Sequence, residues 1–206
     1  LERLGCLDDH CVLIHCIGFS DEDVEKVARA GASVAWCPAS NLFMFNLTCK
    51  IRPLLKAGVN VAIGTDSTGT GSINLLEEMR FARAPYRRLY GEDLGPRTIV
   101  DMVTRNAAKA FRMERDIGAL EPGRLADVLV IRQSAADPYE SLLQTRIEDI
   151  ELIVREGSPL YVDQRWEELF RLRGVDYTRT SVRGRAVCVR GDPPGLLAKV
   201  RAAVGF

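Results

Sequence analysis

The pattern of hydrophobic and polar positions predicts strands alternating with helices in the first third of the chain. Residues 11–16, with the sequence CVLIHC, form a short and nearly continuous apolar run, which is typical of a strand buried on both faces. The segments 32–37 (ASVAWC) and 59–64 (VNVAIG) predict two further strands. The residues between these strands must therefore supply the connections from one strand to the next.

Both connections have the pattern of a helix. Ser20, with Asp23 three residues later, resembles a capping box, and apolar residues then recur at helical spacing until Gly31. A second helix is expected over the apolar positions of 51–55 and ends at Gly58. Strands separated by helices at this spacing predict βαβ units and a parallel sheet.

The second half of the chain has a different pattern. Two more helices are expected first, one over Ile73 to about Leu89 and one from Pro96, a residue favoured in the first helical turn. The sequence then becomes rich in turns and short strands, two of them at 150–154 and 160–162, which predicts a small β module. The tail predicts a polar helix, one alternating strand (SVRGRAVCVR) and a short helix. We therefore divide the chain into an α/β part, a β part and an extension, at 1–115, 116–163 and 164–206.

Composition excludes several classes of function. The 206 residues contain 28 Lys and Arg and 28 Asp and Glu, and this zero formal charge predicts no nucleic-acid partner. No apolar run reaches the length of a membrane span, and the first residues do not resemble a signal peptide. Several of the six cysteines lie in apolar runs, so we expect reduced thiols in a cytoplasmic protein.

Polar residues stand at or beyond the carboxyl end of each predicted strand. His15 ends the first strand, Ser40 and Asn41 follow the second, and Asp66 follows the third. Parallel α/β sheets form their sites at this edge, so the side chains should converge. An aspartate there is either a turn or helix cap, or a metal ligand or catalytic base.

Three kinds of site compete for these residues. Glycines at 64, 69 and 71 resemble a phosphate-binding loop, but Thr70 stands where that loop needs a lysine. The cysteines and histidines of 6–16 lack the paired spacing of a structural zinc site, which favours core packing for the cysteines. A hydrolytic metal site needs a carboxylate to accept a proton from a metal-activated water, and Asp66 with His15 fits that need. Simple packing or capping remains the alternative for His15.

Five motifs together resemble the C-terminal half of the amidohydrolase superfamily. In order they are LIHC, WCPASN, AIGTDS, TRNAAKAF and GALEPGRLADVLVI, and the resemblance runs from about Leu13 to Asp163. The pattern is most similar to the cytosine-deaminase-like and chlorohydrolase-like branch. The resemblance implies an α/β fold, the C-terminal part of a (β/α)8 TIM-type barrel. The three predicted strands would be barrel strands six, seven and eight, followed by part of a small composite β-sandwich.

The resemblance also implies roles for individual residues. Asp66 would bind the metal and move protons, and His15 would face the metal-bound water and the substrate. Ser40, Asn41, Ser67 and Thr68 are the candidate substrate-binding residues. The segment NLFMFN is a candidate aromatic loop of the same pocket, although its two phenylalanines, Phe43 and Phe45, would also suit a core.

The implied activity is that of an aminohydrolase (a deaminase). It would act on a small heteroaromatic ring through water activated by one divalent metal ion, zinc or iron. One alternative is a cyclic amide hydrolase with two metals, in which His15 binds the second metal. Another is a non-catalytic half-barrel fragment that needs a partner chain.

The chain also departs from the family pattern. Trp36 stands where the family often has a histidine, and no His-x-His pair occurs, because His10 and His15 are the only histidines. Three βα units cannot close an eight-stranded barrel. We therefore expect the N-terminal half of the barrel to be missing. The open sheet edge should then be covered by that half or by another copy in a homo-oligomer.

Overall fold

The computed structural model describes residues 1–205, which form two compact units. Unit 1 comprises Leu1–Ala119 and Asp137–Gln144, and unit 2 comprises Leu120–Ala136 and the chain from Thr145 onwards. These boundaries differ from the division expected from sequence. Residues 137–144 belong to unit 1, and the expected extension is not separate because one of its strands pairs with a strand of the β part.

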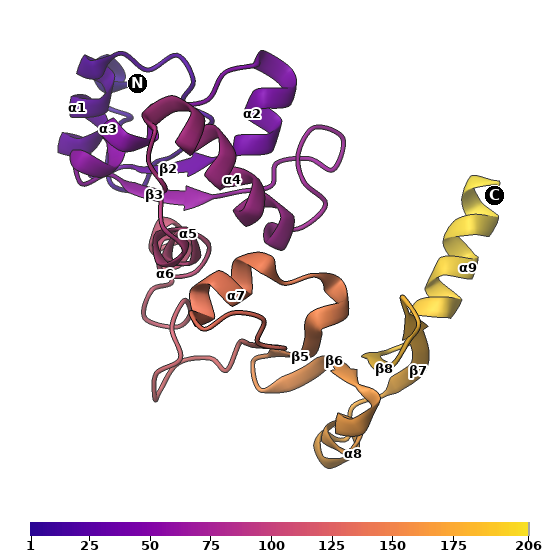
Figure 1. The fold of residues 1–206 in the computed structure, drawn as a ribbon. Coiled ribbons are helices and arrows are strands. Elements are labelled where there is room, and N and C mark those ends of the chain that lie inside the picture. Colours follow the sequence, from indigo (N-terminus) through magenta and orange to yellow (C-terminus); the bar gives the residue numbers. More distant parts are fainter. Residues whose placement is uncertain (206) are drawn as a thin grey trace. The chain divides into compact units, whose positions relative to one another are not determined.

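Unit 1 is built on a parallel three-stranded sheet (Figure 1). The strands lie in the order β1 (Val12–Ile14), β2 (Ser33–Trp36) and β3 (Asn60–Ile63), as the alternating pattern predicted. Ile14 pairs with Ala35, and Ala35 pairs with Ala62. The three strands therefore end at one common edge, and the segments that follow them are brought together.

The helices of unit 1 follow from clear local signals. Helix α1 starts at the Ser20–Asp23 capping box and ends at Gly31, whose φ of 71° suits glycine. Helix α4 starts after Asn74, whose side chain accepts from the Glu77 N–H. The helices are η1 (Glu2–Leu4), α1 (Asp21–Ala30), α2 (Pro38–Phe45), α3 (Ile51–Lys56), α4 (Leu75–Tyr90), α5 (Pro96–Val103), α6 (Arg105–Ala110) and α7 (Pro138–Gln144).

The core of unit 1 lies between the sheet and its helices. Trp36 and Val61 of the sheet are fully buried, as are Leu54 of α3 and Ile99 and Met102 of α5. Burying a side chain of this size contributes about 1.5–3 kcal/mol. This apolar cluster fixes the sheet, and with it the three strand ends.

Three expectations for unit 1 were wrong. The first strand is not buried on both faces, because β1 is an edge strand and leaves Val12 39% and Ile14 60% exposed. The segment NLFMFN is not a loop but part of α2, with Phe43 71% and Phe45 53% exposed, so neither belongs to the core. The single helix expected from Pro96 is two helices, α5 and α6, separated at Thr104.

Unit 2 is an antiparallel five-stranded sheet in the order β4-β5-β6-β8-β7. The alternating segment SVRGRAVCVR was expected to be one strand and is a hairpin, because Arg183 and Gly184 turn the chain with φ of 47° and 80°. The elements are β4 (Val128–Ile131), η2 (Ile147–Asp149), β5 (Ile150–Arg155), β6 (Ser158–Asp163), η3 (Gln164–Trp166), α8 (Glu168–Arg173), β7 (Tyr177–Val182), β8 (Arg185–Arg190) and α9 (Pro193–Val204).

Polar and apolar contacts both support the sheet of unit 2. Val162, Phe170 and Cys188 form a small buried cluster. Arg185 of β8 donates to the Asp163 carboxylate and to the backbone oxygen of Ile150.

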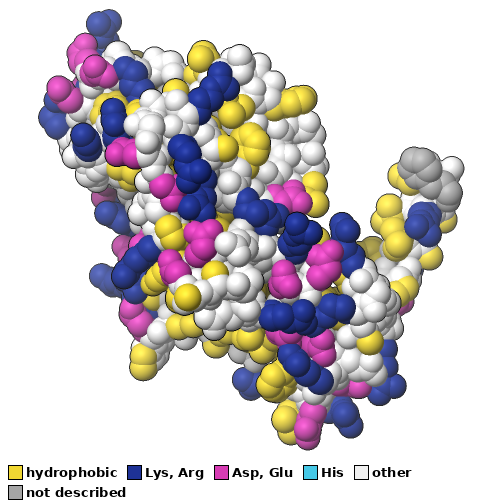
Figure 2. Space-filling model, in the orientation of Figure 1, with side chains coloured by type: hydrophobic (Ala, Val, Ile, Leu, Met, Phe, Trp, Pro, Cys, Tyr) yellow, Lys and Arg dark blue, Asp and Glu magenta, His cyan; other side chains and the backbone are white. Residues whose placement is uncertain are grey.

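Basic and acidic side chains lie next to one another over much of the molecular face drawn in Figure 2. Of the helices described, none is both long and apolar enough to cross a membrane.

Candidate active site

The candidate site is formed where the three parallel strands end. His15 directly follows β1, Ser40 and Asn41 lie in the first turns of α2 after β2, and Asp66 lies three residues beyond β3. His15 and Asp66 both have positive φ, 69° and 59°. Such backbone conformations cost about 1–3 kcal/mol in a residue other than glycine and cluster at functional sites. The fold therefore holds both residues in strained positions.

The carboxylate of Asp66 is the centre of the site. Its Oδ2 accepts a hydrogen bond of 2.5 Å from the Ser40 hydroxyl and one of 3.3 Å from the Thr70 hydroxyl. The Ser40 hydrogen bond holds the pKa of Asp66 below its usual value of 3.8, and Thr70 acts in the same direction. Asp66 is therefore ionised at neutral pH, with its side chain 29% exposed and able to bind a cation.

His15 faces the same carboxylate. Its Nε2 lies 3.8 Å from Asp66 Oδ2, and its Nδ1 donates a 2.8 Å hydrogen bond to the side-chain oxygen of Asn41. Asn41 is fully buried, and its Nδ2 has no hydrogen-bond partner among the described residues. A histidine held through one ring nitrogen keeps a fixed orientation and tautomer. Asn41 therefore holds the His15 ring with its Nε2 on the side of Asp66.

The loop after Asp66 is folded tightly on itself. The N–H groups of Thr70 and Gly71 both donate to the Ser67 carbonyl oxygen, over 3.2 Å and 2.8 Å. Gly71 is required, because a Cβ there would lie 1.7 Å from the Thr65 carbonyl oxygen. The Ser67 hydroxyl lies 2.9 Å from that of Thr70. The structure thus joins Ser67 to Asp66 through Thr70.

The candidates from sequence differ in their surroundings. Ser40 and Asn41 are fully buried and contact Asp66 and His15, whereas Ser67 and Thr68 are exposed on the loop. Sequence inspection missed the contact of Thr70 with Asp66. The only indication of this contact in the sequence is that Thr70, four residues after Asp66, carries a hydroxyl group.

A second missed residue lies behind the site. Glu78 of α4 is fully buried, and its carboxylate accepts from the backbone N–H of Ala39 over 2.9 Å and of Ser72 over 3.2 Å. The sequence places Glu77 and Glu78 side by side in an amphipathic helix, with nothing to indicate which one is buried. Glu78 therefore contacts the segments that carry Ser40 and Asp66 without touching either side chain.

The carboxylate of Asp66 and the imidazole of His15 are groups of the types that bind a divalent metal. An ionised carboxylate and a neutral imidazole nitrogen are zinc ligands, and two ligands of a tetrahedral zinc lie roughly 3.3 Å apart. The 3.8 Å between Asp66 and His15 is close to that value. Two donors are fewer than the three or four protein ligands of a zinc site. Asp66 therefore fits as one member of a larger ligand set.

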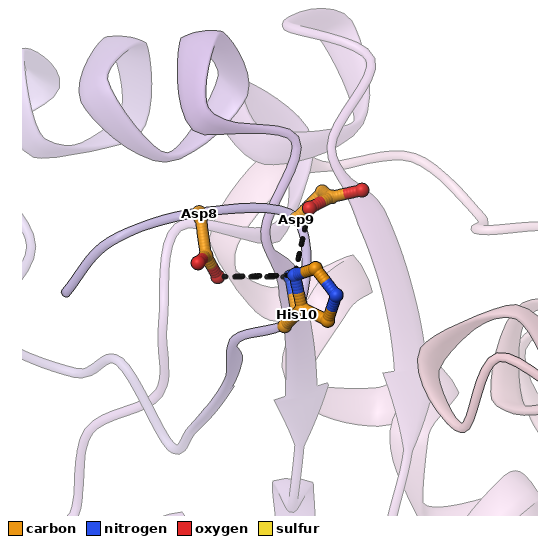
Figure 3. Close-up of side chains that lie close together, drawn as sticks. All are labelled: Asp8, Asp9 and His10. Atoms are coloured by element: carbon orange, nitrogen blue, oxygen red, sulfur yellow. Dashed lines mark hydrogen bonds and ion pairs between the residues drawn. The ribbon is translucent and has the colours of Figure 1, made fainter.

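Within residues 1–205, one group of three acidic or histidine side chains lies close enough together to hold an ion. Asp8, Asp9 and His10 are all exposed, and His10 Nδ1 lies 3.0 Å from Asp9 Oδ1 (Figure 3). They precede β1, whereas His15 follows it. This group is therefore separate from the site at Asp66.

The cysteines near the site are packing residues. Burial raises the pKa of both Cys16 and Cys37 to about 12, so both thiols stay protonated at neutral pH. Cys49 is also buried, and none of the six cysteines forms a disulfide. Core packing, predicted for the cysteines of residues 6–16, is confirmed for Cys16 and holds in part for Cys11, which is half-buried against the core, but was wrong for Cys6, which is exposed.

Comparison with known proteins identifies the family. The model of the amidohydrolase family matches residues 1–162. The chain belongs to the amidohydrolase family. This confirms the resemblance inferred from the five sequence motifs.

Relatives of this amidohydrolase chain include named deaminases. It is 37% identical over 136 residues to the 5-methylthioadenosine/S-adenosylhomocysteine deaminase 2 of Archaeoglobus fulgidus, covering 65% of this chain and 32% of that protein. It is 31% identical over 173 residues to the 5-methylthioadenosine/S-adenosylhomocysteine deaminase of Pyrococcus abyssi, covering 79% and 40%. The chain thus spans about a third to two fifths of the curated relatives it matches.

Solved amidohydrolase structures have the same fold over a similar share of their length. An adenosine deaminase from Xanthomonas campestris with bound zinc matches with a TM-score of 0.73 and 25% identity, over 83% of this chain and 42% of that one. The zinc complex of atrazine chlorohydrolase from Arthrobacter aurescens matches with a TM-score of 0.70 and 27% identity, over 84% and 42%. The three parallel strands and their helices therefore correspond to part of an amidohydrolase barrel.

Proposed function

We propose that the protein to which this chain belongs is a metal-dependent aminohydrolase acting on a heteroaromatic ring. The observation that carries the proposal is the ionised carboxylate of Asp66 facing the imidazole of His15 at the carboxyl edge of a parallel sheet. The deaminase names of its relatives point to an aminopurine nucleoside or a similar ring as the substrate.

Asp66 would be a ligand of one divalent metal ion, with zinc favoured because two similar structures are zinc complexes. When bound, such an ion acts as a Lewis acid and lowers the pKa of a water molecule. Asp66 would accept the proton of the attacking water and deliver it to the leaving amino group. Its lowered pKa keeps it ionised and ready to accept that proton at neutral pH.

The surrounding residues would support this chemistry in two ways. The Nε2 of His15 would hydrogen-bond the substrate or the attacking water, while Asn41 holds the ring through Nδ1. Ser40 would act by orienting Asp66 rather than by touching substrate, because it is fully buried. Ser67 and Thr68, exposed on the loop, would contact the substrate.

We infer that β1, β2 and β3 are strands six, seven and eight of a (β/α)8 barrel. Unit 2 would then contain part of the composite β-sandwich. The remaining metal ligands would come from the rest of the protein, and the same part, or a second copy of the chain, would cover Val12 and Ile14 of β1. Six unpaired cysteines support a reducing, cytoplasmic location.

The test is a substrate screen with the full-length protein. Ammonia release is measured with 5-methylthioadenosine, S-adenosylhomocysteine, adenosine and guanine, before and after removal and return of zinc. Zinc-dependent release from at least one ring is expected, with one metal ion per chain. Chloride release from a chlorotriazine, or hydrolysis of a cyclic amide with two metals per chain, would contradict the aminohydrolase assignment.

The 206-residue chain expressed alone provides a matched comparison. With Asp66 and at most His15 as ligands, it should bind zinc weakly, release no ammonia and self-associate through the open edge of β1. Sedimentation and metal analysis would measure this. A monomer of 22.9 kDa with one tightly held zinc ion would contradict the proposed ligand set.

A further inference from the structure

We propose that Glu78 is a positioning residue. By binding both the start of α2 and the loop after Asp66, it would hold Ser40 in place relative to Asp66. This inference rests on the proposed function, because it assigns Glu78 a role in catalysis through Asp66 and His15. The side chain is fully buried in the first turns of α4. A buried carboxylate is unfavourable unless it is paired or hydrogen-bonded, so its presence needs a specific partner.

The partners of Glu78 are backbone groups of two different segments. One oxygen accepts from Ala39, the second residue of α2, and the other accepts from Ser72. First-turn N–H groups of a helix have no partner inside the helix. The carboxylate of Glu78 therefore binds one N–H group at the start of α2 and another near the end of the loop after Asp66.

These two segments carry both partners of the hydrogen bond at the centre of the site. Ser40, which directly follows Ala39, donates to Asp66 over 2.5 Å. Ser72 ends the loop that starts at Asp66 and contains Thr70, the second donor to this carboxylate. The carboxylate of Glu78 thus fixes the position of Ser40 relative to Asp66. Movement of either segment would lengthen the short hydrogen bond between them.

The chemistry of the contact explains why a carboxylate is needed. Both partners are N–H donors, and an ionised carboxylate offers two acceptor oxygens. A glutamine has the same shape but offers one oxygen and one NH2 group. In Glu78→Gln one backbone N–H would therefore face another donor, and one of the two segments would be released.

The test uses Glu78→Gln in the full-length zinc enzyme, with two control variants on the same helix. Glu77→Gln makes the same chemical change at the neighbouring, half-buried position. Met79→Ala removes a fully packed core side chain, 2% exposed, and lowers stability without touching the site. Each variant is assayed for kcat, KM, zinc content and melting temperature. Amide hydrogen exchange is followed in peptides covering 38–45 and 66–74.

Glu78→Gln should remain folded and lose about ten- to a hundredfold in kcat per bound zinc, the effect of a lost charge-assisted hydrogen bond. KM should stay within about twofold, because Glu78 does not touch the substrate. Exchange should accelerate in one or both peptides. Glu77→Gln should match the parent enzyme, and Met79→Ala should melt earlier with unchanged kcat while folded.

Two results would overturn the assignment. One is an unchanged kcat in Glu78→Gln, and the other is a kcat loss in Met79→Ala as large as that in Glu78→Gln, which would make the role purely structural. The proposed function is checked separately by Asp66→Asn. If that variant stays active, the function fails, while the exchange data still decide whether Glu78 ties the two segments together.

Discussion

Replacing Ser40 by alanine tests whether the short hydrogen bond to Asp66 matters for catalysis. The Ser40 hydroxyl is fully buried and donates to Asp66 Oδ2 over 2.5 Å. A hydrogen bond to a charged group contributes about 1.5–3 kcal/mol. At about 1.36 kcal/mol per factor of ten, its complete loss would lower kcat/KM by about ten- to a hundredfold.

The expected loss lies at the lower end of this range. Thr70 also donates to Asp66 Oδ2, at 3.3 Å, and this weaker bond remains in Ser40→Ala. We therefore expect a loss of about tenfold. The change removes one buried oxygen atom, so the fold should be retained.

The same substitution should alter the pH dependence. The Ser40 hydrogen bond is the main cause that lowers the pKa of Asp66. Without it the pKa rises toward its usual value of 3.8, so Asp66 becomes protonated at a higher pH. The acidic limb of kcat/KM should therefore move to higher pH in Ser40→Ala.

The assay is ammonia release by the full-length protein from about pH 3 to pH 8, so that it spans the usual carboxyl range, with zinc content measured at each end. Ser33→Ala is the matched control, because Ser33 is also a buried serine but lies at the opposite end of β2, where its hydroxyl accepts a hydrogen bond from Asn60, so the rate should stay unchanged. A Ser40→Ala enzyme with parental kcat/KM and an unmoved acidic limb would refute the role assigned to this hydrogen bond.

Three further predictions concern separate parts of unit 1. His15→Ala should lower turnover severely and leave one metal ion bound, and loss of half the metal would instead indicate a two-metal site. Asp93→Asn should lower the free energy of unfolding by about 1 kcal/mol at pH 7. The Arg83 hydrogen bond holds the pKa of Asp93 below 3.8, so this stabilisation is present above 3.8 and disappears as pH falls through the lowered value. Urea unfolding of both proteins should therefore converge near pH 2, and a constant difference would contradict the ion pair. Gly71→Ala should abolish activity with a smaller effect on melting, because its Cβ would lie 1.7 Å from the Thr65 oxygen; a fully active variant would show that the loop is not rigid.

Local patterns were sufficient to predict the framework of the site. The capping box at Ser20, the stop at Gly31 and the three apolar runs gave the parallel sheet, because each signal acts within a few residues of its own position. Once the strands were parallel, the convergence of His15 and Asp66 followed from geometry alone. The structure places their side chains 3.8 Å apart.

The features that sequence inspection missed depend on contacts between distant segments. Helix α2 was taken for a loop because NLFMFN has no polar face, and its exposed phenylalanines would suit packing on residues outside this chain. The hairpin at Arg183 was missed because alternation continues through the turn. Glu78 could not be told from Glu77, since its burial depends on Ala39, which lies 39 positions earlier in the chain.

The most direct test of the whole account is the zinc content and ammonia release of Asp66→Asn in the full-length protein. Loss of a metal ligand and a proton acceptor at one position should lower turnover by several orders of magnitude and weaken zinc binding. Circular dichroism should remain that of the parent protein, because the Asp66 side chain is 29% exposed and not part of the core. A variant that keeps its zinc and more than about a tenth of its activity would contradict the account.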